Sequence, residues 1–224
     1  MSSLKAGYSD GAGGVADAGA RGDGASSAAG AAGAGAQGDG AMDAASACAR
    51  GDGVAGVASA AGAAGVGYSF IIRRAEAGDA QSIYDILQSS FAEYIRQSGI
   101  GAAVGDMVGS LDGIRRDIAN IDVFIACMDG VPVGTVRVEI LDGESALLTK
   151  LGVMAGYGNI GIGKSLLNLV DKVIAARGVR TLCLYTASKN ASLMRFYYGR
   201  GFYADSTAKD RGYIRALMKK DYAR

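Results

Sequence analysis

The residues best suited to chemistry lie in a glycine-dense stretch from Gly156 to Gly163, which Lys164 follows directly. An apolar run from Leu147 to Met154 precedes this stretch, and apolar residues at helical spacing follow it. Glycines let a backbone approach an anion closely, and amide N–H groups at the start of a helix bind phosphate with help from the helix dipole. The stretch therefore predicts a site for a phosphate-containing ligand.

The chain contains no histidine, and this absence limits the catalytic nucleophiles and the metal sites that it can form. Ser-His-Asp and Cys-His pairs are excluded, and so are the common histidine-ligated metal sites. The three cysteines, Cys48, Cys127 and Cys183, are widely spaced, which is typical of a reducing compartment and predicts neither a zinc site nor a disulfide framework. Proton transfer must then use Tyr, Glu, Asp, Lys, Cys or water.

The overall charge favours no large polyanionic partner, because the net charge of the 224 residues is only +1. No apolar run reaches the length of about 18 residues expected of a membrane span. The N-terminus also lacks the basic start and leucine-rich core of a secretory signal. We therefore expect a cytoplasmic protein without nucleic-acid or membrane partners.

The first part of the chain, residues 1–67, consists mostly of Gly and Ala with few large apolar side chains. Such a composition buries too little apolar surface to offset the loss of chain entropy. We expect a disordered low-complexity tail over 1–67, followed by one folded domain over 68–224. Two Arg-Gly-Asp triplets, at Arg21 and Arg50, are consistent with this biased composition.

The elements that must position the glycine stretch alternate between strands and helices. Apolar residues with β-branched or aromatic side chains mark the strands, and spacings of three and four residues mark the helices. Residues 98–106 are glycine-rich and are expected to form a loop. The predicted strands are 68–74, 122–128, 131–141, 150–154, 181–186, 201–203 and 212–218, and the predicted helices are 79–97, 107–120, 164–177 and 190–198.

Two families use a similar glycine pattern. Gly158-Asn159-Ile160-Gly161-Ile162-Gly163 resembles the pyrophosphate loop of the Gcn5-related N-acetyltransferases (GNAT), although Gly158 stands where that family usually has Arg or Gln, and Ala155 where it often has proline. The same stretch, from Gly158 to Ser165, also fits the P-loop of nucleoside triphosphatases and kinases, Gly-x-x-x-x-Gly-Lys-Ser/Thr. The loop alone leaves both interpretations open.

A second motif favours the acetyltransferases. The segment from Asn190 to Phe202 resembles the second GNAT signature, Asn-x-x-Ala-x-x-Leu-Tyr-x-x-x-Gly-Phe, with Leu193 and Phe196 as departures from it. The likeness covers about residues 68–222. It implies an α/β GNAT fold, in which a mixed and mostly antiparallel sheet is flanked by helices and has a V-shaped split between its fourth and fifth strands.

The resemblance also implies roles for individual residues. Acetyl-CoA is the expected cosubstrate, with no metal, and Tyr197 is the expected general acid beside its sulfur. The acceptor is a primary amine of a small molecule, peptide or protein, which attacks directly in a ternary complex, and a homodimer is compatible with the family. The residues expected to bind the coenzyme are Leu151, Gly152 and Val153 along the pantetheine, Gly158, Asn159, Gly161, Ile162, Gly163 and Lys164 around the pyrophosphate, and Asn190.

Simpler interpretations remain for several of these residues. Tyr197 is also consistent with a packed aromatic side chain, and Asn190 with an N-cap. The sequence does not identify a base for the amine, for which Glu139, Glu144 and Tyr185 are candidates. A coenzyme-A-binding module without activity is a further alternative.

Overall fold

The computed structural model describes residues 56–61, 67–101, 104–141 and 143–222. Its strands are β1 (Gly56–Ala61), β2 (Gly67–Arg74), β3 (Asp122–Met128), β4 (Val131–Ile140), β5 (Ser145–Val153), β6 (Thr181–Ala187), β7 (Tyr203–Ala208) and β8 (Arg215–Asp221). Its helices are the 3-10 turn η1 (Ala77–Asp79), α2 (Ala80–Ser98), α3 (Val104–Val108), α4 (Leu111–Asn120), α5 (Ile162–Ala176) and α6 (Ala191–Tyr198).

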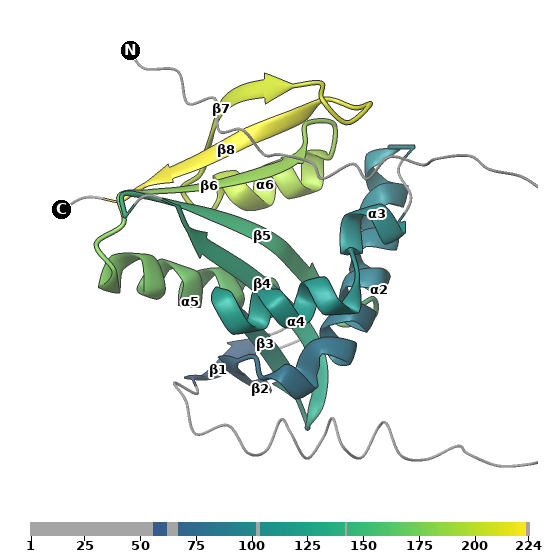
Figure 1. Cartoon of the computed structure of the whole chain (residues 1–224), viewed down its shortest axis with the longest axis vertical. Helices are drawn as coiled ribbons and strands as arrows, with labels where there is room; N and C mark the ends of the chain where they lie inside the picture. Colours follow the sequence, from purple (N-terminus) through teal and green to yellow (C-terminus); the bar gives the residue numbers. More distant parts are fainter. Residues whose placement is uncertain (1–55, 62–66, 102–103, 142, 223–224) are drawn as a thin grey trace, which may run out of the picture. The chain divides into compact units, whose positions relative to one another are not determined.

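The strands form one open sheet in the order β1-β2-β3-β4-β5-β6-β8-β7 (Figure 1). Every neighbouring pair is antiparallel except β5 and β6, which are parallel. Parallel neighbours need a long crossover, which α5 supplies here. This arrangement confirms the predicted fold class, because β5 and β6 are the fourth and fifth of the strands that the sequence predicted.

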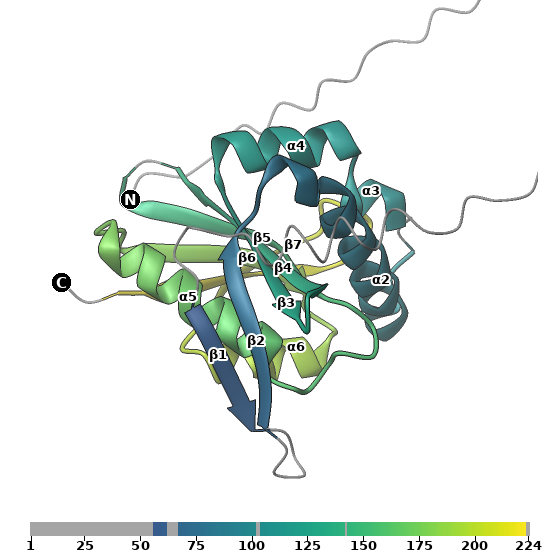
Figure 2. The same cartoon turned by 90° about the horizontal axis from the view of Figure 1, so that it is seen from below.

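Helices cover both faces of the sheet (Figures 1 and 2). On one face α2 and α4 pack over β3 around Ile86, Leu87 and Ile125. On the other face α5 and α6 pack over the middle strands around Leu166 and Leu184. Each helix buries one apolar stripe against the sheet, which is the main source of its stability.

The tail prediction is wrong for part of its range, because Gly56–Ala61 forms β1 and pairs antiparallel with β2 from Gly56↔Ile72 to Ala61↔Gly67. These residues lack the β-branched pattern by which strands are recognised, so backbone pairing with β2 outweighs their weak strand propensity. The rest of the segment, 1–55 and 62–66, lies outside the described residues, and the predicted domain boundary stays a prediction.

Smaller differences concern a loop, a strand and the cysteines. The predicted loop 98–106 contains the start of α3, and the last strand is Arg215–Asp221 rather than 212–218. Cys127 is disulfide-bonded, so the expectation of no disulfide framework does not hold for Cys127. Within the described ranges, no helix is both long and apolar enough to cross a membrane.

Candidate functional site

The sheet is interrupted between β5 and β6. The two strands pair only at Ser145↔Thr181, Ala146↔Leu182 and Leu147↔Cys183. Beyond these pairs β5 continues along β4, and β6 continues along β8, so the two ribbons diverge in Figure 1. We call the region between residues 148–153 of β5 and residues 184–187 of β6 the split. Along it, each strand offers a backbone edge that the other strand does not pair.

A β-bulge lies on the β5 side of the split. Thr135 pairs with Gly152 while Arg137 pairs with Thr149, so Val136 opposes two residues of β5. One of those two, Lys150, has a left-handed φ of 52°. A bulge bends its strand and increases the local twist. This one changes the direction of β5 just before Leu151, Gly152 and Val153, the residues predicted to face the pantetheine.

The glycine stretch connects the end of β5 to the start of α5. Left-handed backbone conformations occur at Gly156 (φ 90°), Asn159 (φ 63°) and Gly161 (φ 93°), and Gly161 is the N-cap of α5. The helix begins at Ile162, two residues before the predicted start. Its hydrogen-bond ladder begins with the Ser165 amide donating to the Gly161 carbonyl.

The backbone amides of this turn are available to a ligand. Within the described chain, we find no intramolecular acceptor for the amide N–H of the predicted pyrophosphate-binding residues Gly158, Asn159, Gly161, Ile162, Gly163 and Lys164. The first amides of a helix lack partners inside the helix and take them from caps, water or ligands. The Lys164 side chain is exposed, and a Cβ added at Gly158 would meet nothing within 4 Å.

Close packing fixes where α5 begins. The Ile162 side chain is buried, and its Cγ2 lies 2.8 Å from where a Cβ on Gly134 of β4 would be. Only glycine at position 134 allows this approach. The contact therefore places the free amides of the α5 N-terminus against the middle of the sheet, at the end of β5.

Asn190 lies at the other side of the split, where β6 leads into α6. Its Oδ1 accepts a hydrogen bond from the Leu193 amide at 3.1 Å, which makes it the N-cap of α6, and its Nδ2 donates to Ser98 Oγ at 3.0 Å. The residue is only 3% exposed. The N-cap interpretation is therefore confirmed, and the contact with pantetheine stays a prediction.

Tyr197, on α6, is buried and packs edge-to-face against Phe196 and Phe202, at ring-centroid distances of 5.4 and 5.6 Å. Burial raises the pKa of Tyr197 well above its ordinary value, and the nearby Tyr94 adds to the shift. The phenol therefore keeps its proton at neutral pH, which a general acid requires. Packing and catalysis both fit this environment, so the catalytic role stays a prediction.

Helix α2 supplies contacts that the sequence analysis missed. Ser90, Tyr94 and Ser98, which we call the α2 stripe, follow one another at intervals of four residues and so share one helix face. Ser90 faces Gly152 of β5, Tyr94 Oη accepts a hydrogen bond from the Ala187 amide of β6 at 2.7 Å, and Ser98 contacts Asn190. Three hydroxyls at this spacing within an otherwise apolar face were the only sequence signal.

Tyr94 joins several parts of the site. Its hydroxyl shares a hydrogen bond with Tyr213, which lies between β7 and β8. Burial, followed by the nearby Tyr213 hydroxyl, raises the pKa of Tyr94 to about 12. The α2 stripe thus contacts β5, β6 and the start of α6, and it connects the two sides of the split.

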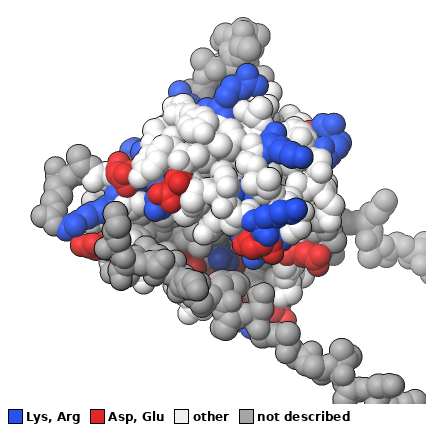
Figure 3. All heavy atoms as spheres, turned by 90° about the horizontal axis from the view of Figure 1, so that it is seen from above, with Lys and Arg blue, Asp and Glu red and all other residues white. Residues whose placement is uncertain are grey.

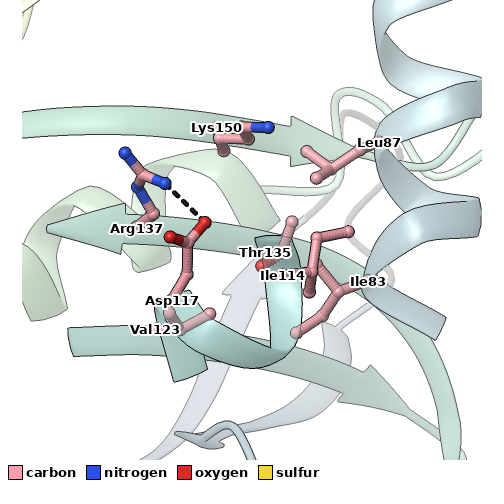
Figure 4. Close-up of a pocket in the computed structure, with 8 residues that line it drawn as sticks. All are labelled: Ile83, Leu87, Ile114, Asp117, Val123, Thr135, Arg137 and Lys150. Carbon is pink, nitrogen blue, oxygen red and sulfur yellow. Dashed lines mark hydrogen bonds and ion pairs between the residues drawn. The ribbon is translucent and has the colours of Figure 1, made fainter. Parts of the chain in front are cut away.

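A small cavity of about 10 Å³ lies under α2 and α4, with room for one water molecule at most. Figure 4 shows Lys150, Arg137 and Asp117 at its edge, with Arg137 and Asp117 forming an ion pair. Lys150 Nζ donates a hydrogen bond to the Val108 carbonyl at the end of α3. Burial lowers the pKa of Lys150, Arg137 lowers it further, and Asp117 opposes the shift.

The candidate bases are not brought together at the split. Glu139 lies 3.9 Å from Arg137, and Glu144 pairs with Arg180 at 3.2 Å. Tyr185 is exposed, and the Arg215 guanidinium lies 4.5 Å from its ring centroid. The structure singles out none of the three as the base.

Charges of both signs are interspersed on the face seen in Figure 3, around an area without charged side chains. Lys219 of β8 and Asp205 of β7 form one ion pair between charges of opposite sign, at 3.0 Å. Among the described residues, no group of three or more Cys, Asp or Glu side chains could hold a metal ion.

Comparison with known proteins identifies relatives of this chain and of its fold. The model of the acetyltransferase (GNAT) family matches residues 81–202. A curated relative, the spermidine N(1)-acetyltransferase of Thermoplasma acidophilum, is 29% identical over 99 residues, which are 43% of this chain and 61% of that protein. The chain therefore spans about three fifths of the length of this relative.

Solved structures share the fold at low sequence identity. The PaiA N-acetyltransferase of Thermoplasma acidophilum, solved with coenzyme A, superposes with a TM-score of 0.61 at 23% identity, over 69% of this chain and 99% of that one. The YncA acetyltransferase of Salmonella typhimurium, solved with acetyl-CoA, superposes with a TM-score of 0.56 at 17% identity, over 69% of this chain and 95% of that one. The ribosomal-protein-S18-alanine N-acetyltransferase of Escherichia coli superposes with a TM-score of 0.57 at 18% identity, over 69% of this chain and 95% of that one.

Proposed function

Because the chain belongs to the acetyltransferase (GNAT) family, we propose that it transfers an acetyl group from acetyl-CoA to a primary amine. The observation that carries the proposal is the place where two features meet. The unpaired edge of β5 ends at the turn whose free amides open α5. An extended ligand with a pyrophosphate at one end fits such a site, because strand edges bind extended chains and helix N-termini bind phosphate.

Family membership also favours pyrophosphate binding over the P-loop interpretation of residues Gly158 to Ser165. The loop here joins β5 to α5, the crossover helix that leads to β6 within a mostly antiparallel sheet. Lys164 lies exposed on the first turn of α5, behind the amides. We therefore assign the pyrophosphate to the amides of the turn and give the Lys164 side chain no essential part.

The residues of the site fit coenzyme A part by part. The amides of Gly158, Asn159, Gly161, Ile162 and Gly163 would hold the pyrophosphate, and the open space at Gly158 leaves room for it. Leu151, Gly152 and Val153 offer the backbone edge along the pantetheine, and one of their amides would polarise the thioester carbonyl. The Asn190 side chain already bonds Leu193 through Oδ1 and Ser98 through Nδ2, so its Nδ2 has one remaining N–H for a pantetheine carbonyl.

Acetyl-CoA supplies an activated acetyl group, and the residues of this chain position the thioester and transfer protons. Tyr197, whose pKa burial raises, would hold a proton for the departing sulfur. A free amine is mostly protonated near neutral pH, so a base or a water chain must take up a proton first. The acceptor is a primary amine of a small molecule or a protein, the two classes on which the relatives act by name.

Binding and turnover test the proposal separately. Acetyl-CoA without metal should stabilise the protein, by about 2.7 kcal/mol at a concentration of 100 times Kd. Turnover should then appear as release of free thiol with at least one member of an amine panel that includes spermidine and a peptide with an N-terminal alanine. Binding of coenzyme A without turnover on any amine would leave the inactive binding module as the better assignment.

Lys164→Ala separates the two families directly. The variant should keep its stabilisation by acetyl-CoA and most of its activity, because the amides of the turn remain. In a P-loop the lysine reaches the transferred phosphate, and its loss abolishes activity. Stabilisation of the parent by ATP with magnesium, but not by acetyl-CoA, would overturn the proposal.

A further inference from the structure

The α2 stripe lies against the part of the sheet where the proposed function places the reacting end of the thioester. Gly152 belongs to the run Leu151 to Val153, whose backbone edge is expected to hold the pantetheine and the carbonyl. Ser90 of α2 packs directly on Gly152. A Cβ added there would lie 2.5 Å from Ser90 Oγ and 3.2 Å from Ser90 Cβ.

No room for a methyl group therefore exists between β5 and α2 at this position. Leu87, one turn earlier on α2, is 1% exposed and adds a second wall, with its Cδ2 at 3.5 Å from the same point. Ser90 is itself held in place, because its Oγ donates a hydrogen bond to the Leu87 carbonyl at 3.3 Å. The α2 side of β5 is thus closed by packed atoms rather than by a mobile surface chain.

The β6 side is closed by the next residue of the stripe. The Tyr94 hydroxyl accepts the Ala187 amide at 2.7 Å, at the last residue of β6, and shares a hydrogen bond with Tyr213. The Tyr94 hydroxyl is therefore the hydrogen-bond acceptor for the last backbone N–H of β6. Ser90 and Tyr94 stand about 6 Å apart along the helix axis, one on each strand bordering the split.

We propose that Ser90 and Tyr94 limit the acyl group of the donor to a short one, so that acetyl fits the split and longer chains meet α2. This specificity role rests on the proposed function, because it needs the thioester to lie along Leu151 to Val153. A chain extended by methylenes has to displace Ser90 from Gly152 or Tyr94 from Ala187. One methylene too many in a packed pocket typically costs roughly 10- to 200-fold.

Calorimetric affinities for coenzyme A, acetyl-CoA, propionyl-CoA and butyryl-CoA test the role without reference to turnover. The parent protein should bind acetyl-CoA at least about tenfold more tightly than butyryl-CoA. Ser90→Gly removes both atoms that face Gly152 and should reduce this ratio at least about fivefold. Ser82→Gly makes the same change in α2 roughly 12 Å earlier along the helix and should leave the ratio unchanged.

A double variant fills the volume that Ser90→Gly removes, this time with a side chain from β5. Adding Gly152→Ala to Ser90→Gly places a methyl group from β5 in the space that α2 has given up, so the preference for acetyl-CoA should return. Ser90→Gly retains the amides of the α5 turn and should bind coenzyme A itself.

The outcomes are distinct. Equal ratios in the parent and in Ser90→Gly, or a parent that binds butyryl-CoA as well as acetyl-CoA, would overturn the length limit while leaving the proposed function intact. A parent that binds neither coenzyme A nor any thioester would overturn the proposed function, and the length limit with it.

Discussion

Tyr197 is the residue on which the proposed chemistry depends most. It is 6% exposed and packed between two phenylalanines, and within the described chain we find no hydrogen bond to its hydroxyl. A phenol that is fixed by packing but keeps its donor free is suited to deliver a proton to a ligand. Because burial raises its pKa, the hydroxyl stays protonated through neutral and mildly alkaline pH, so it should cause no loss of activity there.

Tyr197→Phe keeps the ring and its packing and removes only the hydroxyl. We expect kcat to fall by about tenfold to a few hundredfold, since general acids contribute roughly 10²- to 10⁴-fold and water can partly replace this one. The Tm and the affinity for acetyl-CoA should barely change. Steady-state thiol release on the best amine measures the effect, and a parental rate would make Tyr197 a packing residue.

Asn190 has two partners within the chain, so its loss should be seen first in stability. Asn190→Ala removes the α6 cap and leaves Ser98 Oγ buried without its donor, which together should lower the free energy of unfolding by about 1–3 kcal/mol. Ser110→Ala is the matched control. Ser110 caps α4 by accepting the Gly113 amide at 3.1 Å, and it belongs to neither strand of the split.

Chemical denaturation of both variants compares the two caps, and acetyl-CoA affinity is then measured where each is folded. Ser110→Ala should lose only the cap, about 1 kcal/mol, with unchanged affinity. A weaker affinity in Asn190→Ala alone would support contact with the pantetheine. Equal affinities would limit Asn190 to its structural role.

At the scale of elements, the turn between β5 and α5 depends on its backbone conformation more than on its side chains. Gly161 caps α5 at a φ of 93°, whereas Gly158 does not have a positive φ and faces open space. An L-residue pays about 1–2 kcal/mol in the left-handed region. The two glycines of one motif should therefore tolerate substitution very differently.

Gly161→Ala is expected to lower the free energy of unfolding by about 1–2 kcal/mol and to weaken acetyl-CoA binding, because the strain shifts the amides that begin α5. Gly158→Ala should leave both nearly unchanged. Thermal unfolding with and without acetyl-CoA distinguishes the variants. Equal behaviour of the pair would mean that the amide positions do not control binding.

At the scale of the whole molecule, β1 extends the sheet beyond the domain that the sequence predicted. Removing residues 1–55 should leave the Tm and the acetyl-CoA affinity unchanged, because their Gly- and Ala-rich composition offers little apolar surface. Removing residues 1–65 also deletes β1, which leaves the outer edge of β2 unpaired. This longer deletion should lower the Tm, by about 2–4 °C for each kcal/mol lost.

Both deletions are compared in reducing buffer, so that the disulfide of Cys127 does not contribute. Equal Tm values for the two would show that the β1 pairing adds nothing to stability. A drop already on removal of 1–55 would contradict the expected lack of packing by that segment.

Local patterns predicted most of the fold because they are local. The helical spacings within 79–97 and 164–177, for example, depend on residues close in sequence. The strand β1 was missed because its residues have no strand pattern of their own. The Tyr94–Ala187 contact joins residues 93 positions apart, and no property of either residue predicts the other. The family motifs named residues on the loop and on α6, but they do not include the α2 stripe.

The short ladder of three residue pairs between β5 and β6 also affects how cooperatively the sheet unfolds. Backbone ladders make neighbouring strands exchange their amide protons together, and here the ladder is nearly broken in mid-sheet. Strands β6 to β8 are therefore expected to open as a separate foldon, restrained by the core under α5 and by the α2 stripe. A ligand lying along both free edges would join the two foldons. Slower deuterium uptake in β5 and β6 together would then report binding, even for an acceptor that is never acetylated.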